Sequence, residues 1–122
     1  MKSGLELIAD ERQRQIDVKG YSFDHDRIQR QNESIRGKYE TLKKAAEAYE
    51  KNDINLWPWD RKLFKPTLQD PVRRLTKAGA LYKAQYDCLQ QFPDDLKILQ
   101  QECLNGVERV SKEIDYIQSH PF

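Results

Sequence analysis

The sequence predicts an all-α fold: a four-helix bundle with a long aromatic loop between the second and third helices and an antiparallel C-terminal helical hairpin. Apolar residues recur at steps of three and four along four stretches, which is the spacing of a buried helix face. All five prolines fall at the expected breaks or in the loop. The length suits one core, so we expect a single helical domain over residues 1–122.

The first helix is expected from Gly4 to about Val18, after a capping box formed by Ser3 and Glu6. The second is expected to begin near Asp24 or Asp26 and to end near Lys51. Its acidic pairs, such as Glu47 with Glu50, are typical of solvated helix faces.

The third helix is expected to start at Asp70 as the N-cap and Pro71 as the first helical residue. Gly79 lies on its apolar face, where a missing side chain favours close approach of another helix. A break at Phe92–Asp94 then turns the chain into a fourth helix, which ends at His120. The apolar positions of this fourth helix are Leu96, Leu99, Cys103, Val107, Val110, Ile114 and Ile117.

The balance of 21 basic and 20 acidic residues argues against general DNA binding, which usually needs a clear basic excess. No apolar run approaches the ~20 residues of a membrane span, and no signal peptide is evident. Cys88 and Cys103 are too few for a disulfide scaffold and are expected to be free thiols inside helices. We therefore expect a cytoplasmic protein.

Arg12 and Gln15 lie in the middle of the first helix's apolar face. A buried guanidinium needs a partner, because an unpaired charge there costs several kcal/mol. One interpretation is an internal salt bridge, for instance to Asp26 or Asp60, and the other is an anion-binding site. In either case we expect the first helix to meet the 52–69 loop.

The 52–69 segment holds both tryptophans and is long for a structureless loop, which favours a functional role. Trp57 and Trp59 stand beside Arg61 and Lys65, and such side chains can stack a base and hold its phosphates. The alternative is an aromatic plug that closes the bundle.

The pair His25-Asp26 could bind a metal, but His120 is the one other histidine in the chain. A capping aspartate beside a hydrogen-bonding histidine is the favoured interpretation. No catalytic metal site is predicted.

Three segments, 7–26, 56–66 and 74–81, together resemble a family of small phage and prophage proteins. They carry the patterns E-R-x-R-Q, H-D, W-P-W followed by K-P, and K-A-G-A-L in that order. The resemblance implies a phage origin and the host cytoplasm. It also implies a distant similarity to all-α nucleotide pyrophosphohydrolases of the MazG type, which bind Mg²⁺ through helix-borne carboxylates. This chain has Gln85 where such relatives tend to be acidic, and that removes an oxygen ligand.

The function expected is that of a non-enzymatic phage accessory protein that binds a small phosphate-containing ligand, such as a nucleotide, and sequesters a host defence signal. The alternatives are a metal-dependent nucleotide pyrophosphohydrolase and a protein-binding inhibitor without a small ligand. No cofactor and no catalytic residue is assigned. The expected ligand-binding residues are Arg12, Gln15, Tyr21, His25, Trp57, Trp59, Arg61, Lys65 and Lys77. Asp26 and Asp60 are expected to be their structural polar partners.

The fourth helix is also expected to mediate a homo-oligomer. Ile98, Leu104 and Tyr116 widen its apolar surface beyond one seam. A helix with such a surface is a candidate for a symmetric subunit contact.

Overall fold

The structure, a computed structural model, describes residues 1–19, 35–90 and 96–120, and in these ranges it is helical with no strand. Its long helices are α1 (Gly4–Lys19), α3 (Ile35–Lys51), α4 (Pro71–Leu89) and α5 (Lys97–Ser119). Two short 3-10 helices, η1 (Ile54–Leu56) and η2 (Arg61–Leu63), lie in the loop between α3 and α4. The predicted all-α fold and its aromatic loop are confirmed.

The helix starts that the sequence marks are also confirmed. The N–H of Ser3 donates to Oε1 of Glu6 at 3.2 Å, and the N–H of Glu6 donates to Oγ of Ser3 at 3.2 Å. Asp70 caps α4 by accepting the N–H of Arg73 at 3.1 Å, and Pro71 follows as the first helical residue. The expected beginning of the second helix, near Asp24 or Asp26, and the break at Phe92–Asp94 before the fourth helix lie outside the described residues.

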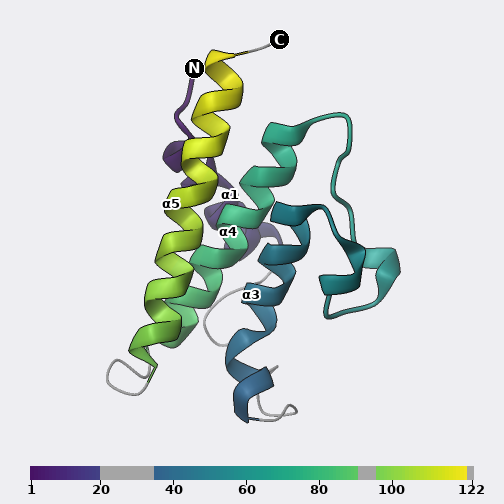
Figure 1. Cartoon of the computed structure of the whole chain (residues 1–122), viewed down its shortest axis with the longest axis vertical. Helices are drawn as coiled ribbons and strands as arrows, with labels where there is room; N and C mark the ends of the chain where they lie inside the picture. Colours follow the sequence, from purple (N-terminus) through teal and green to yellow (C-terminus); the bar gives the residue numbers. More distant parts are fainter. Residues whose placement is uncertain (20–34, 91–95, 121–122) are drawn as a thin grey trace.

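Helix α4 is the centre of the bundle, because α1, α3 and α5 all pack against it. Figure 1 shows α3 and α5 running antiparallel to α4 on its two sides, while α1 crosses behind it. The antiparallel pair α4 and α5 is the predicted C-terminal hairpin. The loop from residue 52 to residue 70 projects on the far side of α3 from α5 (Figure 1).

The main core lies where the four long helices meet. It includes Ile8 of α1, Leu42 and Ala46 of α3, Leu81 of α4 and Ile114 of α5. Gly79 confirms the predicted close approach, since a β-carbon there would lie 2.5 Å from Cγ1 of Ile8. A smaller cluster of Leu89, Leu99 and Cys103 fills the other end of the hairpin. Among the described helices, none combines the length and apolar character that crossing a membrane requires.

Candidate functional site

Helix α1 buries polar side chains in its contact with the bundle, as the sequence predicts. Arg12 is 6% exposed and Gln15 is 3% exposed. Nε of Arg12 donates to Oδ2 of Asp87 at 3.1 Å, and Lys83 pairs with the other carboxylate oxygen at 3.1 Å. The buried guanidinium is therefore joined to α4 by an ion pair.

The prediction that Asp60 pairs with Arg12 was wrong. The carboxylate of Asp60 accepts the N–H of Lys62 at 2.9 Å and caps η2. Helix α1 packs on α4 and α5, whereas η1 of the loop packs on α3, so these helices do not bring Arg12 to the loop. The other partner considered, Asp26, lies outside the described residues, as do the predicted ligand-binding residues Tyr21 and His25.

Glu11 is a buried charge that the sequence analysis missed. Arg14 donates to its carboxylate at 2.8 and 2.7 Å, and Nη1 of Arg73 donates at 2.8 Å. Burial by itself would raise the pKa of Glu11, but these guanidinium hydrogen bonds outweigh it and hold the pKa below its usual value. Arg14, three residues along the helix, was a local signal for this pair, whereas Arg73 of α4 could not be inferred from spacing.

Two buried amides, Gln15 of α1 and Gln85 of α4, have unsatisfied atoms. Oε1 of Gln15 has no hydrogen-bond partner among the described residues, and neither has Nε2 of Gln85. Gln15 lies one helical turn after Arg12 on the same side of α1. Gln85 lies two residues before Asp87, so it points to the other side of α4, where its Oε1 accepts the N–H of Lys43 in α3 at 3.2 Å. A buried polar atom without a partner costs about 1–3 kcal/mol. Such atoms in a native fold require an explanation, and a bound polar group is one.

The aromatic side chains of the loop pack against the bundle. The ring of Trp57 lies 5.1 Å from that of Tyr49 and 5.1 Å from that of Trp59, and Phe64 lies 5.0 Å from Tyr49. Nε1 of Trp57 donates to the carbonyl of Asp60 at 3.0 Å. These contacts give the tryptophans the packing role of an aromatic plug, which was the alternative to base stacking.

The basic residues predicted beside this plug have different roles. Nζ of Lys77 donates to the carbonyl of Lys65 at 2.8 Å and to Oγ1 of Thr67 at 2.9 Å, so it fastens the loop to α4. Arg61 and Lys65 are exposed on the loop surface. Among the described residues, the predicted ligand set is therefore divided between α1 on one side and the loop with Lys77 of α4 on the other.

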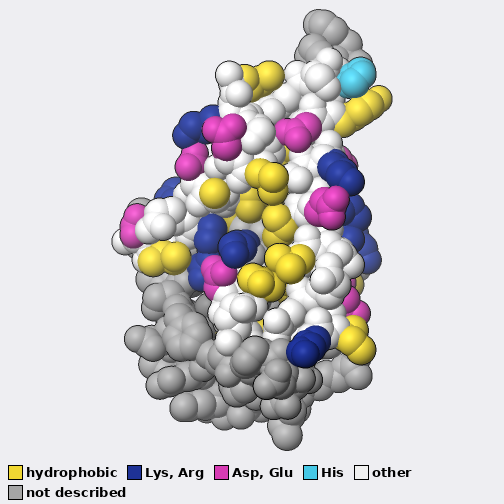
Figure 2. All heavy atoms as spheres, turned by 90° about the vertical axis from the view of Figure 1, so that its left-hand side faces the viewer, with side chains coloured by type: hydrophobic (Ala, Val, Ile, Leu, Met, Phe, Trp, Pro, Cys, Tyr) yellow, Lys and Arg dark blue, Asp and Glu magenta, His cyan; other side chains and the backbone are white. Residues whose placement is uncertain are grey.

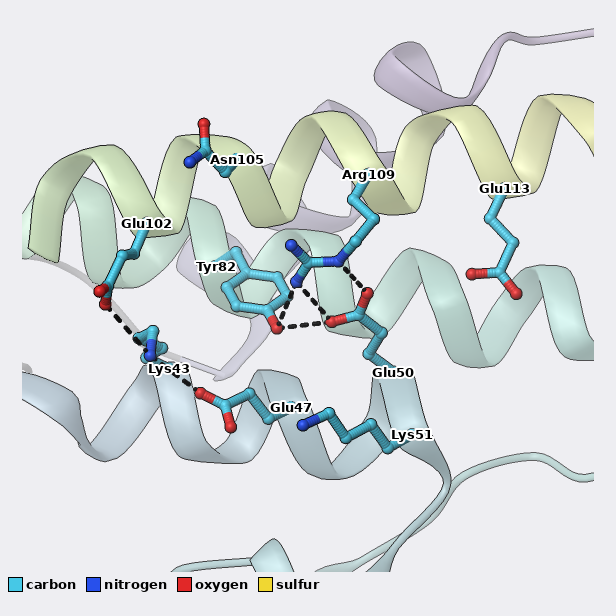
Figure 3. A pocket seen from close by; sticks show the side chains of 9 residues that line it. All are labelled: Lys43, Glu47, Glu50, Lys51, Tyr82, Glu102, Asn105, Arg109 and Glu113. Atoms are coloured by element: carbon cyan, nitrogen blue, oxygen red, sulfur yellow. Dashed lines mark hydrogen bonds and ion pairs between the residues drawn. The ribbon is translucent and has the colours of Figure 1, made fainter.

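A charged groove of about 590 Å³ opens between α3 and α5 (Figure 3). Tyr82 of α4 lies between the two helices, as Figure 3 shows. The other residues that line the groove are Lys43, Glu47, Glu50 and Lys51 from α3, and Glu102, Asn105, Arg109 and Glu113 from α5.

At the centre of the groove, several hydrogen bonds converge on Glu50. The expectation that Glu50 lies on a solvated helix face was wrong. Its side chain is 10% exposed; Arg109 donates to it at 2.6 and 2.8 Å, and the hydroxyl of Tyr82 donates at 2.6 Å. Burial opposes ionisation of Glu50, but the bonds from Arg109 and Tyr82 prevail and lower its pKa. Burial and the neighbouring carboxylate raise the pKa of Tyr82.

At one end of the groove, Nζ of Lys43 lies 3.0 Å from Glu47 and 3.3 Å from Glu102, as the dashed lines in Figure 3 show. Burial acts against the ammonium form, but these carboxylates raise the pKa of Lys43. The ion pairs of Lys43 with Glu102 and of Arg109 with Glu50 join α5 to α3. We therefore assign the groove a structural role.

Other side chains that could take part in chemistry are buried or packed against a neighbour. Cys88 and Cys103 are buried and form no disulfide, and burial raises the pKa of the Cys103 thiol to about 12. The ring of His120 stacks on that of Tyr116 at 4.1 Å. Within the described ranges, no group of three or more His, Cys, Asp or Glu side chains is placed to hold a metal ion.

Neither family models, nor curated proteins, nor solved structures match this chain. A proposal for its function must therefore start from the side chains described above.

Proposed function

We propose that this chain binds a small phosphate-containing ligand without turning it over, at the polar contact between α1 and α4. The observation that carries the proposal is the burial of Arg12 together with Gln15, whose Oε1 atom lacks a hydrogen-bond partner among the described residues. The guanidinium of Arg12 can donate to phosphate oxygens, whereas Oε1 of Gln15 can only accept and therefore suits a hydroxyl or N–H group elsewhere on the ligand.

Arg12 has the chemistry that phosphate recognition needs. Its planar guanidinium presents several donors in a fixed geometry that matches phosphate oxygens. Burial strengthens such interactions, because the effective dielectric constant is lower than in water. Asp87 is only about two-thirds buried, with a side chain that is 33% exposed, so an entering anion can compete with it for Arg12.

Binding without turnover agrees with the state of the reactive side chains in the described part. The two thiols are buried, and the high pKa of Cys103 keeps it protonated at neutral pH. A protein that holds a ligand without converting it can sequester that ligand. The phage resemblance makes a host defence signal the kind of ligand to test, by analogy.

The first experiment is a thermal-shift screen of the whole chain against inorganic phosphate, ribose 5-phosphate, nucleoside phosphates and cyclic dinucleotides, with and without Mg²⁺. A compound that binds only the folded state raises the melting temperature. We expect at least one compound to do so without Mg²⁺ and to be recovered unchanged. If no compound raises the melting temperature, the proposal is wrong, and release of pyrophosphate would contradict binding without turnover.

The second experiment separates ligand binding from structural pairing. Arg12→Met and Asp87→Asn both break the Arg12–Asp87 ion pair, so both should lower stability. Asp87→Asn retains the guanidinium and removes its competing carboxylate, so calorimetry should find the phosphate compound bound as tightly as before or more tightly. Arg12→Met should weaken binding at least tenfold. If the two variants lose the same amount of binding affinity, Arg12 acts only by stabilising the fold.

A further inference from the structure

The carboxylate of Asp87 is held at both of its oxygens by cations from two helices. Oδ2 lies 3.1 Å from Nε of Arg12 in α1, and Oδ1 lies 3.1 Å from Nζ of Lys83 in α4. Lys83 stands one helical turn before Asp87, so these two side chains share one side of α4. An anionic group in the position of this carboxylate therefore lies between two positive charges.

The three side chains differ in how far they reach into solvent. The side chain of Arg12 is 7% exposed, that of Asp87 is 33% exposed and that of Lys83 is 41% exposed. The guanidinium thus forms the buried side of the position, and the ammonium forms its solvent-facing side. Ion pairs between partly exposed side chains are weak, because water and dissolved ions compete for both partners. An anion that arrives from solvent can therefore take the place of the carboxylate.

The charges of this arrangement favour one class of anion. Arg12 and Lys83 together exceed Asp87 by one positive charge, and an anion that displaces Asp87 meets both cations. A phosphate monoester carries about 1.5 to 2 negative charges at neutral pH, whereas a diester carries about one. Because Coulomb attraction grows with the charge of each partner, the monoester matches the two cations better.

We infer, resting on the proposed function, that Lys83 is a second phosphate-binding residue and that the site takes a terminal phosphate monoester in the position that Asp87 fills. The unesterified oxygens of the phosphate accept hydrogen bonds from Arg12 on the buried side and from Lys83 on the solvent side. Cyclic dinucleotides, whose phosphates are all diesters, are then weaker ligands than nucleoside monophosphates.

The test is calorimetry of the whole chain with inorganic phosphate, adenosine monophosphate and the methyl phosphate ester of adenosine monophosphate. The ester keeps the nucleoside and removes one negative charge. Lys83→Met should weaken the binding of adenosine monophosphate roughly fivefold and reduce its advantage over the ester, whereas Lys83→Arg should retain most of the affinity. Lys44→Met, an exposed change on α3, is the control for net charge and should bind like the unmodified chain.

A loss of affinity in Lys83→Met has a second explanation, since Asp87 without Lys83 competes more strongly for Arg12. The same change in an Asp87→Asn background separates the two explanations, because the competing carboxylate is absent there. We expect the loss to persist in that background, as contact between Lys83 and the phosphate requires. Circular dichroism checks that each variant is folded.

Three results would each contradict the inference while the proposed function stands. They are full affinity in a folded Lys83→Met variant, disappearance of the loss in the Asp87→Asn background, and diesters that bind the unmodified chain as tightly as monoesters. If the unmodified chain binds none of the three probes and none of the compounds of the screen, both the inference and the proposed function are wrong.

Discussion

Gly106 of α5 lies directly against the ring of Tyr82 in α4. A β-carbon at position 106 would lie 2.7 Å from Cδ1 of that ring and 2.8 Å from Cδ2. Because Tyr82 is buried and its hydroxyl is held by Glu50, the ring cannot move aside without breaking that bond. The glycine therefore allows α5 to approach α4 closely enough for Arg109 to reach Glu50.

The first prediction is that Gly106→Ala destabilises the protein, although alanine is the better helix former by about 1 kcal/mol. Overpacking of a filled core typically costs about 1–3 kcal/mol, and chemical denaturation measures the change. Asn105→Ala, at the exposed neighbouring position, is the control for helix propensity. In a Tyr82→Leu background the effect of Gly106→Ala should shrink, and an undiminished loss would contradict the steric explanation.

The second prediction concerns the dependence of stability on pH. Because the pKa of Glu50 is lower in the folded chain than its ordinary value of 4.5, the carboxylate stabilises the fold above that pH. The contribution is lost as the pH falls through the folded pKa. Glu50→Gln should therefore cost about 1 kcal/mol at pH 7, since Arg109 is half exposed, and nothing in strong acid. Urea melts of both proteins from pH 7 to pH 3 measure their free energies of unfolding. If these differ by the same amount at every pH, the proposed dependence on the ionisation of Glu50 is wrong.

The third prediction is that Lys77 holds the aromatic loop on the bundle. Lys77→Met removes the hydrogen bonds to Lys65 and Thr67, which are worth about 1 kcal/mol each. The loop should then loosen around its half-buried tryptophans, and tryptophan emission should shift to longer wavelength. Lys62→Met, an exposed change in the same loop, should leave the emission unchanged. Identical spectra for all three proteins would show that the plug holds without Lys77.

The fourth prediction is self-association through α5, which remains an expectation from the sequence. The structure limits the apolar surface of α5 that a second copy could contact. Val110 and Ile114 face the chain's own core, whereas Ile98 is 79% exposed and Tyr116 is 62% exposed. Figure 2 shows the side of the molecule that lies on the left in Figure 1, where apolar side chains alternate with Lys, Arg, Asp and Glu side chains.

Light scattering at micromolar concentration measures the assembly directly. We expect a mass above that of one 14.5 kDa chain, and we expect Ile98→Glu with Tyr116→Glu to reduce it without lowering the melting temperature of the monomer. Lys112→Glu, an exposed change on the same helix, is the control. A monomer at all concentrations would refute the prediction.

Much of the fold could be predicted from short-range patterns. The capping box at Ser3, the Asp70-Pro71 start of α4 and the close approach at Gly79 all follow from residues within a few positions of each other. The polar pair Arg12 and Gln15 was recognised for the same reason, because helical spacing alone places it on a buried face. The separation of the predicted ligand residues of α1 from those of the loop and Lys77 of α4 could not be predicted, since it depends on which helices each segment contacts.

By itself, the sequence determined the all-α class, the helix caps and the burial of Arg12, because these depend on local geometry that repeats with the helical period. Only the tertiary structure decided that Arg12 pairs with Asp87, that Glu50 is buried by Tyr82 and Arg109, and that Gln85 bonds Lys43. Each of those pairs joins residues on different helices. Their contact depends on how the helices cross, and backbone spacing along one helix carries no information about that crossing.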